Sequence, residues 1–279
     1  MRNRPRAIAC MLLFMVAGGL PPATLRAQVR AHALADLADR SPRAAFTMAP
    51  APAPGAMPLP ATRDDHPKVI RWYHGLLFAG AVAALSPLDE PARDGVQDIR
   101  TNSSNDVARA IRHVGQPEVY ATVALGTVAA GLISGNSNLT RAGARITSGI
   151  ALGGATVALL KLGIGRRRPF SSEDQYTFGP FSKVDASFPS GHTMTAFALA
   201  TGVSDEVHSL PVTIGMYSLA TGVAWSRMND NKHWLTDVVA GAAIGITSVK
   251  LMNGRWRVFG VSAPKVLLGP GSVGVSVSH

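Results

Sequence analysis

The sequence is poor in cysteine, in aromatic residues and in acidic side chains. Cys10 is the only cysteine among 279 residues, and Asp and Glu number 17 against 27 Lys and Arg, which gives a net charge of +10. An excess of basic groups suits anionic partners such as phosphate esters or an acidic membrane surface. Nucleic acid is the main alternative among anionic partners. The basic residues are scattered and do not interleave with aromatics, so no nucleic-acid-binding surface is indicated.

The N-terminus has the features of a secretory signal peptide. Basic residues at positions 2, 4 and 6 precede an apolar run from Ala7 to Leu20, and small residues follow at Ala23 and Ala27. We expect cleavage after residue 27, because the run is shorter than the roughly 20 residues that span a bilayer. An uncleaved signal anchor is the alternative. Cys10 lies in this segment, so the exported chain would lack thiols, disulfides and cysteine metal sites.

The next segment, residues 28–66, is rich in Ala, Pro and Arg and ends in alternating Ala and Pro from Ala49 to Pro54. Repeated proline disfavours a helix interior and favours extended, solvated chain. We therefore predict a disordered linker, followed by a helical domain over 67–254 and a tail over 255–279.

The predicted domain is a series of apolar segments rich in small residues, separated by polar loops. Their lengths favour helices, so we expect an all-α fold, a compact bundle of about six helices. Glycines spaced by four let helix backbones approach closely, although chance accounts for such pairs equally well. The glycine pairs are 131/135, 149/153 and 241/245, and the segments are 72–85, 119–134, 146–162, 192–203, 211–225 and 236–252, with an amphipathic piece over 96–113 before the second.

The tail carries a turn signal, Gly269-Pro270-Gly271, between two valine-rich stretches at Val258–Val261 and Val273–Val277. This pattern predicts either a short β-hairpin or a loose tail.

A polar cluster interrupts the apolar segments between Ser226 and Asp237. His233 and Asp237 are four residues apart, so on one helical turn the carboxylate would accept the second N–H of the imidazole. A histidine held in this way has a nucleophilic free nitrogen. Arg227 beside it supplies charge for a phosphate or carboxylate.

Two further polar clusters lie upstream. Lys161 and the arginines 166–168 close the third apolar segment, and we expect Pro169 to end that helix. Ser190-Gly191-His192 opens the next helix, where Ser190 can act as N-cap and free N–H groups can face an anion. Each cluster alone also suits a purely structural role.

Together the three clusters resemble the signature of the type 2 phosphatidic acid phosphatase superfamily, which also contains class A acid phosphatases and vanadium haloperoxidases. The signature is Lys161-x6-Arg168-Pro169, then Pro189-Ser190-Gly191-His192, then Ser226-Arg227-x5-His233-x3-Asp237, and every polar position is filled. The resemblance covers about residues 72–252.

The resemblance implies a role for each matching residue. His233 would be the nucleophile, oriented by Asp237, and His192 would be the general acid and base. The phosphate would be bound by Lys161, Arg168, Ser190, Gly191 and Arg227. It implies a metal-independent phosphatase that needs no cofactor and acts on phosphomonoesters or pyrophosphates, of lipids such as phosphatidic acid and polyprenyl pyrophosphate or of small molecules.

Several alternatives remain open at this stage. A vanadium haloperoxidase would use the same site, and a membrane or anion-binding scaffold would use the same fold without catalysis. The aromatic residues Tyr176, Phe178, Phe181 and Trp234 either line a substrate pocket or pack in the interior. If the N-terminus were exported and the first three apolar segments each crossed the membrane, Arg168 would lie in the cytoplasm. We therefore favour a periplasmic domain, with membrane association as the alternative and the oligomeric state undetermined.

Overall fold

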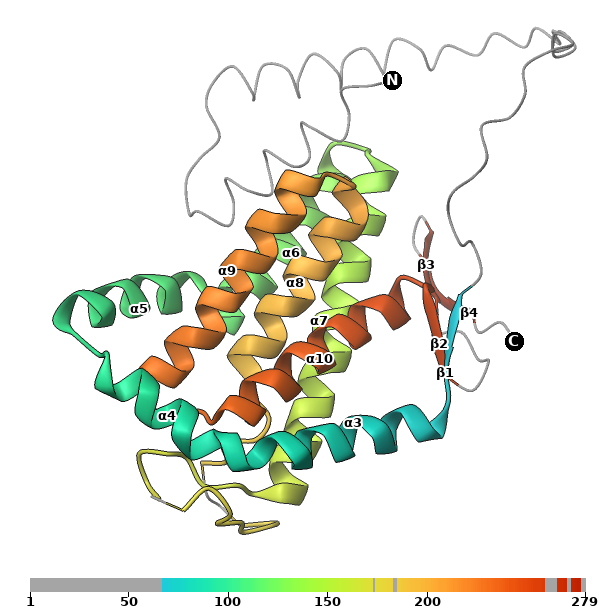
Figure 1. The fold of residues 1–279 in the computed structure, drawn as a ribbon. Coiled ribbons are helices and arrows are strands. Elements are labelled where there is room, and N and C mark those ends of the chain that lie inside the picture. Colours follow the sequence, from blue (N-terminus) through green and yellow to red (C-terminus); the bar gives the residue numbers. More distant parts are fainter. Residues whose placement is uncertain (1–66, 173, 183–184, 259–264, 270–271, 277–279) are drawn as a thin grey trace, which may run out of the picture.

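The computed structural model describes residues 67–258, except 173 and 183–184, together with 265–269 and 272–276. The predicted signal peptide and the predicted linker lie outside the described residues. The described part is mostly helical, as predicted, with a few short strands at its edge (Figure 1).

The six predicted apolar segments correspond to six of the helices, but α7 begins at residue 137, ahead of the predicted 146. The single amphipathic piece is divided into α4 and α5, because Thr101 caps a new helix by accepting the N–H of Ser104 at 3.1 Å. The helices are α3 (Trp72–Leu85), the 3-10 turn η1 (Ser86–Leu88), α4 (Asp89–Asp98), α5 (Asn102–Val114), α6 (Pro117–Ile133), α7 (Ser137–Ile164), α8 (Gly191–Val207), α9 (Leu210–Asn229) and α10 (Leu235–Met252).

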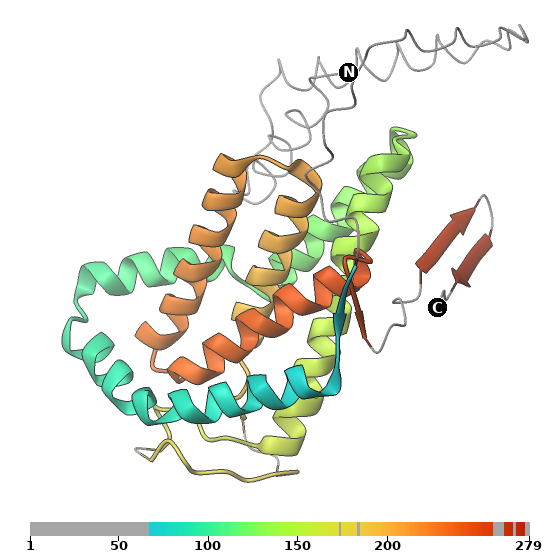
Figure 2. The same cartoon turned by 45° about the vertical axis from the view of Figure 1, so that its right-hand side comes forward.

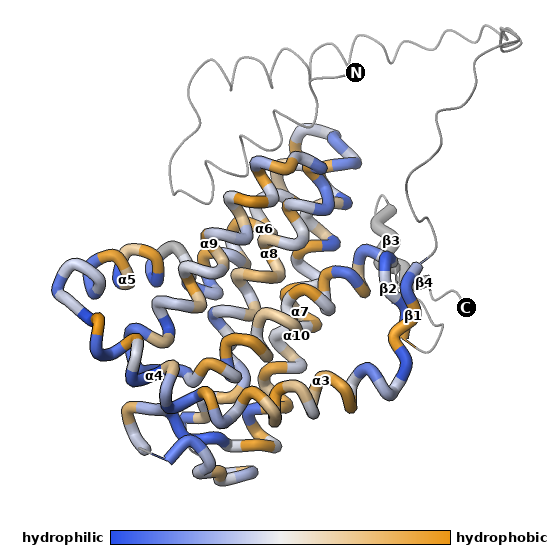
Figure 3. The backbone as a smooth tube through the Cα atoms, viewed as in Figure 1, coloured by the Kyte–Doolittle hydropathy of each residue, from blue (hydrophilic) through white to orange (hydrophobic). Residues whose placement is uncertain are grey.

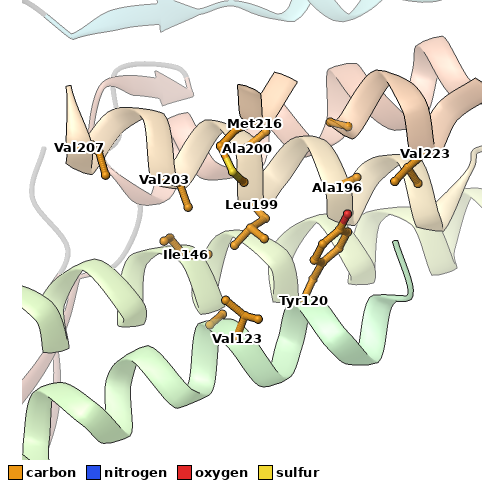
Figure 4. Close-up of a cluster of buried hydrophobic side chains, with 12 residues drawn as sticks. Tyr120, Val123, Ile146, Ala196, Leu199, Ala200, Val203, Val207, Met216 and Val223 are labelled. Carbon is orange, nitrogen blue, oxygen red and sulfur yellow. The ribbon is translucent and has the colours of Figure 1, made fainter. Parts of the chain in front are cut away.

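Helix α8 is the centre of the bundle and contacts α6, α7, α9 and α10. Figures 1 and 2 show α6 to α9 standing side by side, with α10 crossing them and α3 running across one end. Leu199 and Val203 of α8 are 1% exposed and pack against Ile146 of α7 and Val123 of α6 (Figure 4). Each such buried side chain contributes about 1.5–3 kcal/mol to folding.

Two glycines of α10 allow its backbone to approach α8. A Cβ atom at Gly241 would collide with the carbonyl oxygen of Ser190, and one at Gly245 would collide with that of Met194. The predicted role of this glycine pair in close helix packing is therefore confirmed. The contact also sets the N-terminal ends of α8 and α10 beside each other.

The other two glycine pairs differ from each other. Gly149 and Gly153 lie where α7 meets α10 and α8, since a Cβ at Gly149 would lie 2.6 Å from Val249. The pair Gly131 and Gly135 lies at the turn between α6 and α7, where Gly135 has a φ of 65° and open space around it. Close helix packing was therefore the wrong interpretation for Gly135.

Short strands bring the two ends of the described chain together. Strand β1 (Lys68–Ile70) pairs in parallel with β2 (Trp256–Val258), and β3 (Lys265–Gly269) pairs antiparallel with β4 (Ser272–Ser276). The predicted hairpin is confirmed. Its first strand was wrongly placed, because position 258 pairs with Ile70 in β2. Residues 270–271 of the turn signal lie outside the described residues.

Apolar residues occur along most of the helices (Figure 3), and many of the large ones are exposed. Helices α7 and α10 are long and apolar enough to cross a membrane, with mean hydropathy 1.5, and only 22% of the α7 window is buried. Helix α3 contains no buried residue, and its Leu76 and Leu77 are exposed. The exposed large apolar side chains are most numerous on α3, and others lie on α6, on α7 and in the loop after α7.

Candidate active site

The three predicted clusters meet at one end of the bundle, where α8 and α10 begin and α7 and α9 end (Figure 1). The backbone N–H of Ser190 donates to the carbonyl of Asp237 at 3.0 Å, which joins the second cluster to the third. The backbone N–H of Lys232 donates to the carbonyl of Arg227 at 3.0 Å, which closes the turn after α9.

Helix α7 ends at Gly165 and not at Pro169. Gly165 has a φ of 61° and donates its N–H to the carbonyl of Lys161 at 2.9 Å, which caps the helix in the left-handed conformation that glycine favours. The predicted helix end at the proline is therefore wrong. Arg166 to Arg168 lie beyond the helix, where Arg166 pairs with Phe178 in an isolated antiparallel bridge.

Lys161 and Arg168 are both held by the loop between α7 and α8. The ammonium group of Lys161 donates to the carbonyl oxygens of Ala186 and Ser187, the latter at 3.3 Å. Arg168 contacts Asp185 through Nη2 and Oδ1 at 2.7 Å, and its Nε donates to the Asp185 carbonyl at 3.2 Å. The loop thus holds two cations close to the start of α8.

Ser190 caps α8, as predicted. Its fully buried hydroxyl oxygen accepts from the hydroxyl of Thr193 at 3.0 Å and from its backbone N–H at 3.5 Å. Within the described residues, the backbone N–H groups of Gly191 and His192 have no hydrogen-bond partner. Such free N–H groups at the start of a helix suit an anion.

His233 is buried, with 3% of its surface exposed, and its Nδ1 lies 3.4 Å from Oδ2 of Asp237. His233 lies just before α10, which begins at Leu235, so the two residues do not share a turn of this helix. The two residues still meet, because the carboxylate of Asp237 folds back over the helix start. There its Oδ2 also accepts the backbone N–H of Trp234 at 2.9 Å.

The two site histidines share one electrostatic environment. Burial lowers the pKa of His233 to about 4, although the contact with Asp237 acts in the opposite direction. Burial likewise lowers the pKa of His192 to about 4, and the positive charges of Arg227 and Arg168 and the nearby His233 add to that effect. Near neutral pH both rings are therefore uncharged in the free protein.

Arg227, in the last turn of α9, is largely buried and incompletely bonded. Its Nη1 lies 3.1 Å from Oδ2 of Asp230, while its Nε is buried and has no hydrogen-bond partner in the described part of the chain. Asp230 also pairs with Arg112 of α5 at 2.7 Å. A buried donor without a partner is costly, and an anion bound beside Arg227 would satisfy it.

The aromatic residues near the site divide into two groups. Trp234 is fully buried and its Nε1 donates to the carbonyl of Arg167 at 3.0 Å, so it packs in the interior. Tyr176, Phe178 and Phe181 are at least half exposed in the loop after α7. Trp234 therefore supports the loop that carries the arginines.

Sequence reasoning assigned Asp89 no role and placed Arg166 only within a basic cluster. The structure buries both side chains beside Asp237. The only local signal at Asp89 is an acidic residue in the first turn of α4, which many helices share. Among the described residues, no three His, Cys, Asp or Glu side chains gather as a metal site.

Comparison with known proteins matches one part of the chain. The profile of the PAP2 superfamily matches residues 142–257. Lipid A 1-phosphatase of Porphyromonas gingivalis is 37% identical over 110 residues, which are 39% of this chain and 22% of that protein. The chain thus spans about a fifth of the length of this curated relative.

Two solved structures are similar in fold. The first transmembrane PAP2 type phosphatidylglycerolphosphate phosphatase from Bacillus subtilis has a TM-score of 0.52 and 25% identity, over 64% of this chain and 92% of that one. The LpxE structure from Aquifex aeolicus has a TM-score of 0.47 and 20% identity, over 60% of this chain and 94% of that one.

The segment matched by the family profile contains all eight predicted site residues, from Lys161 to Asp237, together with most of α7 and helices α8 to α10. The part of the chain that holds the predicted site is therefore similar to the PAP2 superfamily.

Proposed function

We propose that this protein is a metal-independent phosphatase that hydrolyses a phosphomonoester or pyrophosphate of a lipid through a phosphohistidine on His233. The observation that carries the proposal is the buried contact between His233 Nδ1 and Asp237, at the end of the bundle where α8 begins. That contact fixes the ring so that Nε2 is left to act as nucleophile.

In the first step, Nε2 of His233 attacks phosphorus and the bond from phosphorus to the leaving oxygen breaks. His192 is protonated in the complex, because the negative charge of the bound phosphate raises its pKa, and it donates its proton to that oxygen, so the alcohol or phosphate product leaves with this oxygen protonated. In the second step, His192 takes a proton from water, the water oxygen attacks phosphorus, and the bond to His233 breaks. Inorganic phosphate leaves, and both histidines return to their starting forms.

Side chains of the site would balance the negative charge of the phosphoryl group during its transfer. Lys161, Arg168 and Arg227 supply three positive charges, and the hydroxyl of Ser190 and the N–H of Gly191 add oriented donors. Fixed donors and cations stabilise the charge that develops on the equatorial oxygens of a phosphoryl group. The unpartnered Nε of Arg227 supports this arrangement, since a bound phosphate oxygen would be its acceptor.

A lipid substrate is supported by the relatives and by the surface. The matched relative is named a lipid A 1-phosphatase, and one similar structure is a phosphatidylglycerolphosphate phosphatase. The exposed apolar side chains of α3 and α7 suit contact with a lipid phase. We propose an exported protein that acts at the membrane from the periplasmic side. Retention of the expressed protein in the membrane pellet after alkaline carbonate extraction would contradict a periplasmic domain that only associates with the membrane.

The test is phosphate release from a lipid monophosphate, a polyprenyl pyrophosphate and a small soluble ester, with His233→Ala as the blank. We expect release from a lipid substrate, and loss of at least a thousandfold in the variant. His113→Ala, at an exposed position of α5, is the matched control and should keep the parent rate. Equal rates for His233→Ala and parent would refute the mechanism. Bromide oxidation with added vanadate, without phosphate release, would favour a haloperoxidase.

A further inference from the structure

Asp89 is a fully buried carboxylate contributed by α4, outside the segment that matches the family profile. Its Oδ1 accepts the backbone N–H of Thr236 at 2.7 Å, and its Oδ2 accepts the hydroxyl of Thr236 at 2.6 Å. The same Oδ2 lies 2.7 Å from Nη2 of Arg166. Asp89 thus ties the first turn of α10 to the segment that follows α7.

Arg166 is the partner that connects Asp89 to the site. Its side chain is 4% exposed, and its Nη1 donates to Oδ1 of Asp237 at 3.1 Å and to the hydroxyl of Thr236 at 2.7 Å. Its Nε donates to the carbonyl of Gln175 at 2.9 Å. The planar guanidinium is therefore held at three corners, which fixes its direction as well as its charge.

The two oxygens of Asp237 have separate partners as a result. Oδ1 faces Arg166, while Oδ2 faces His233 and the backbone N–H of Trp234. Without Arg166, Oδ1 of Asp237 would lose this partner and the carboxylate would be held through Oδ2 alone, while Asp89 and Asp237 would both be buried without the counter-charge of Arg166.

We propose that Arg166, itself anchored by Asp89, is a positioning residue that aims the carboxylate of Asp237 at His233. This inference rests on the proposed function, because Arg166 acts only through the nucleophile. Mutation of groups that orient a metal-bound histidine typically costs about 10- to 100-fold in activity, and we expect the same scale for a group that orients Asp237 toward His233. We expect a loss of that size in kcat, with KM changed less than about twofold, since Arg166 does not contact the substrate.

The test is a double-mutant cycle that combines Arg166→Gln with Asp237→Asn. If Arg166 acts through Asp237, Arg166→Gln lowers kcat about 10- to 100-fold in the parent and has no further effect in the Asp237→Asn background. A merely structural role would lower kcat in both backgrounds. Arg167→Gln is the matched control, because the neighbouring side chain is exposed and the substitution is the same.

Arg166→Gln leaves Asp89 buried without its counter-charge, so its folding is checked by thermal unfolding. If Arg166→Gln does not fold, we use Asp89→Asn and Arg166→Lys in its place. The first variant keeps the arginine, and the second keeps its positive charge. We expect both to lose at least fivefold in kcat at unchanged KM, and parent kcat in either folded variant would overturn the inference. A parent that releases no phosphate from any substrate would instead refute the proposed function.

Discussion

Asp185 forms an ion pair with Arg168, with 2.7 Å between Oδ1 and Nη2, although the side chain of Asp185 is 73% exposed. Arg168 is one of the three cations proposed to bind the substrate phosphate. An incoming phosphate must therefore displace the carboxylate of Asp185 before it gains the full charge of Arg168. The carboxylate of Asp185 therefore competes with the substrate phosphate for Arg168.

We expect Asp185→Asn to lower KM by up to about fivefold, because exposed ion pairs are worth about 0.2–1 kcal/mol. The turnover number kcat should change little, since the carboxylate leaves before the chemistry begins. The measurement is steady-state kinetics together with inhibition by inorganic phosphate. Glu206→Gln, which removes a charge from an ion pair at the opposite end of α8, is the control. An unchanged or higher KM for Asp185→Asn would contradict the prediction.

Arg112 of α5 neutralises Asp230, which in turn holds Arg227. Without Arg112 the carboxylate of Asp230 would draw on Arg227 alone and would reduce the charge available to phosphate. Arg112→Gln should therefore raise KM about two- to fivefold with little change in kcat. Arg109→Gln removes a cation from an exposed pair on the same helix, and its KM should match the parent value. Equal KM values for Arg112→Gln and Arg109→Gln would contradict the proposed effect of Arg112 on Arg227.

The two site histidines predict a difference between two pH profiles. His233 must be neutral to attack, so kcat/KM falls as the pH drops through its pKa of about 4. His192 must be protonated to act as the acid, so activity falls as the pH rises through its pKa, which is about 4 in the free protein. Bound phosphate brings negative charge that raises the pKa of His192.

We therefore expect the basic limb of the kcat profile to lie at higher pH than the basic limb of kcat/KM, because kcat reports the complex with substrate. Both profiles are measured with the same lipid substrate between pH 3 and 9. His192→Ala should flatten the basic limb of kcat. Coincident basic limbs in the parent would show that His192 is not the acid.

The helices were predictable because apolar length is a local property of the chain, and the meeting of the three clusters was implied by the resemblance to a known family. The sequence could not separate the three consecutive arginines. Arg166 turns inward, Arg167 is exposed and Arg168 faces Asp185, because the chain leaves α7 at Gly165 before it reaches them. Only the folded chain shows where each side chain points after that turn.

Partners distant in sequence were equally inaccessible. Asp89 contacts Thr236, 147 positions later, and β1 pairs with β2 across most of the chain. Neither segment carries a pattern that distinguishes it, since β1 has three residues and Asp89 resembles any acid in a first helical turn. The buried position of Asp89 beside Arg166 and Thr236 therefore follows from tertiary packing and from no local signal.

The glycine contact between α8 and α10 predicts a coupled loss of stability and activity. In Gly241→Ala the new methyl group would collide with the carbonyl of Ser190, so α8 and α10 must separate at the end that holds the site. Overpacking of this kind costs about 1–3 kcal/mol, which corresponds to roughly 2–12 °C in Tm for a domain of this size. The shift of Ser190 should also lower kcat/KM by more than about tenfold.

Gly215→Ala is the matched control, because Gly215 lies in α9 and a methyl group added there would have nothing within 4 Å of it. That substitution should stabilise the helix by about 0.5–1 kcal/mol. Thermal unfolding and phosphate release are measured on both variants. A Gly241→Ala protein as stable and active as Gly215→Ala would mean that the ends of α8 and α10 tolerate separation. The phosphate-binding geometry would then not depend on their close contact.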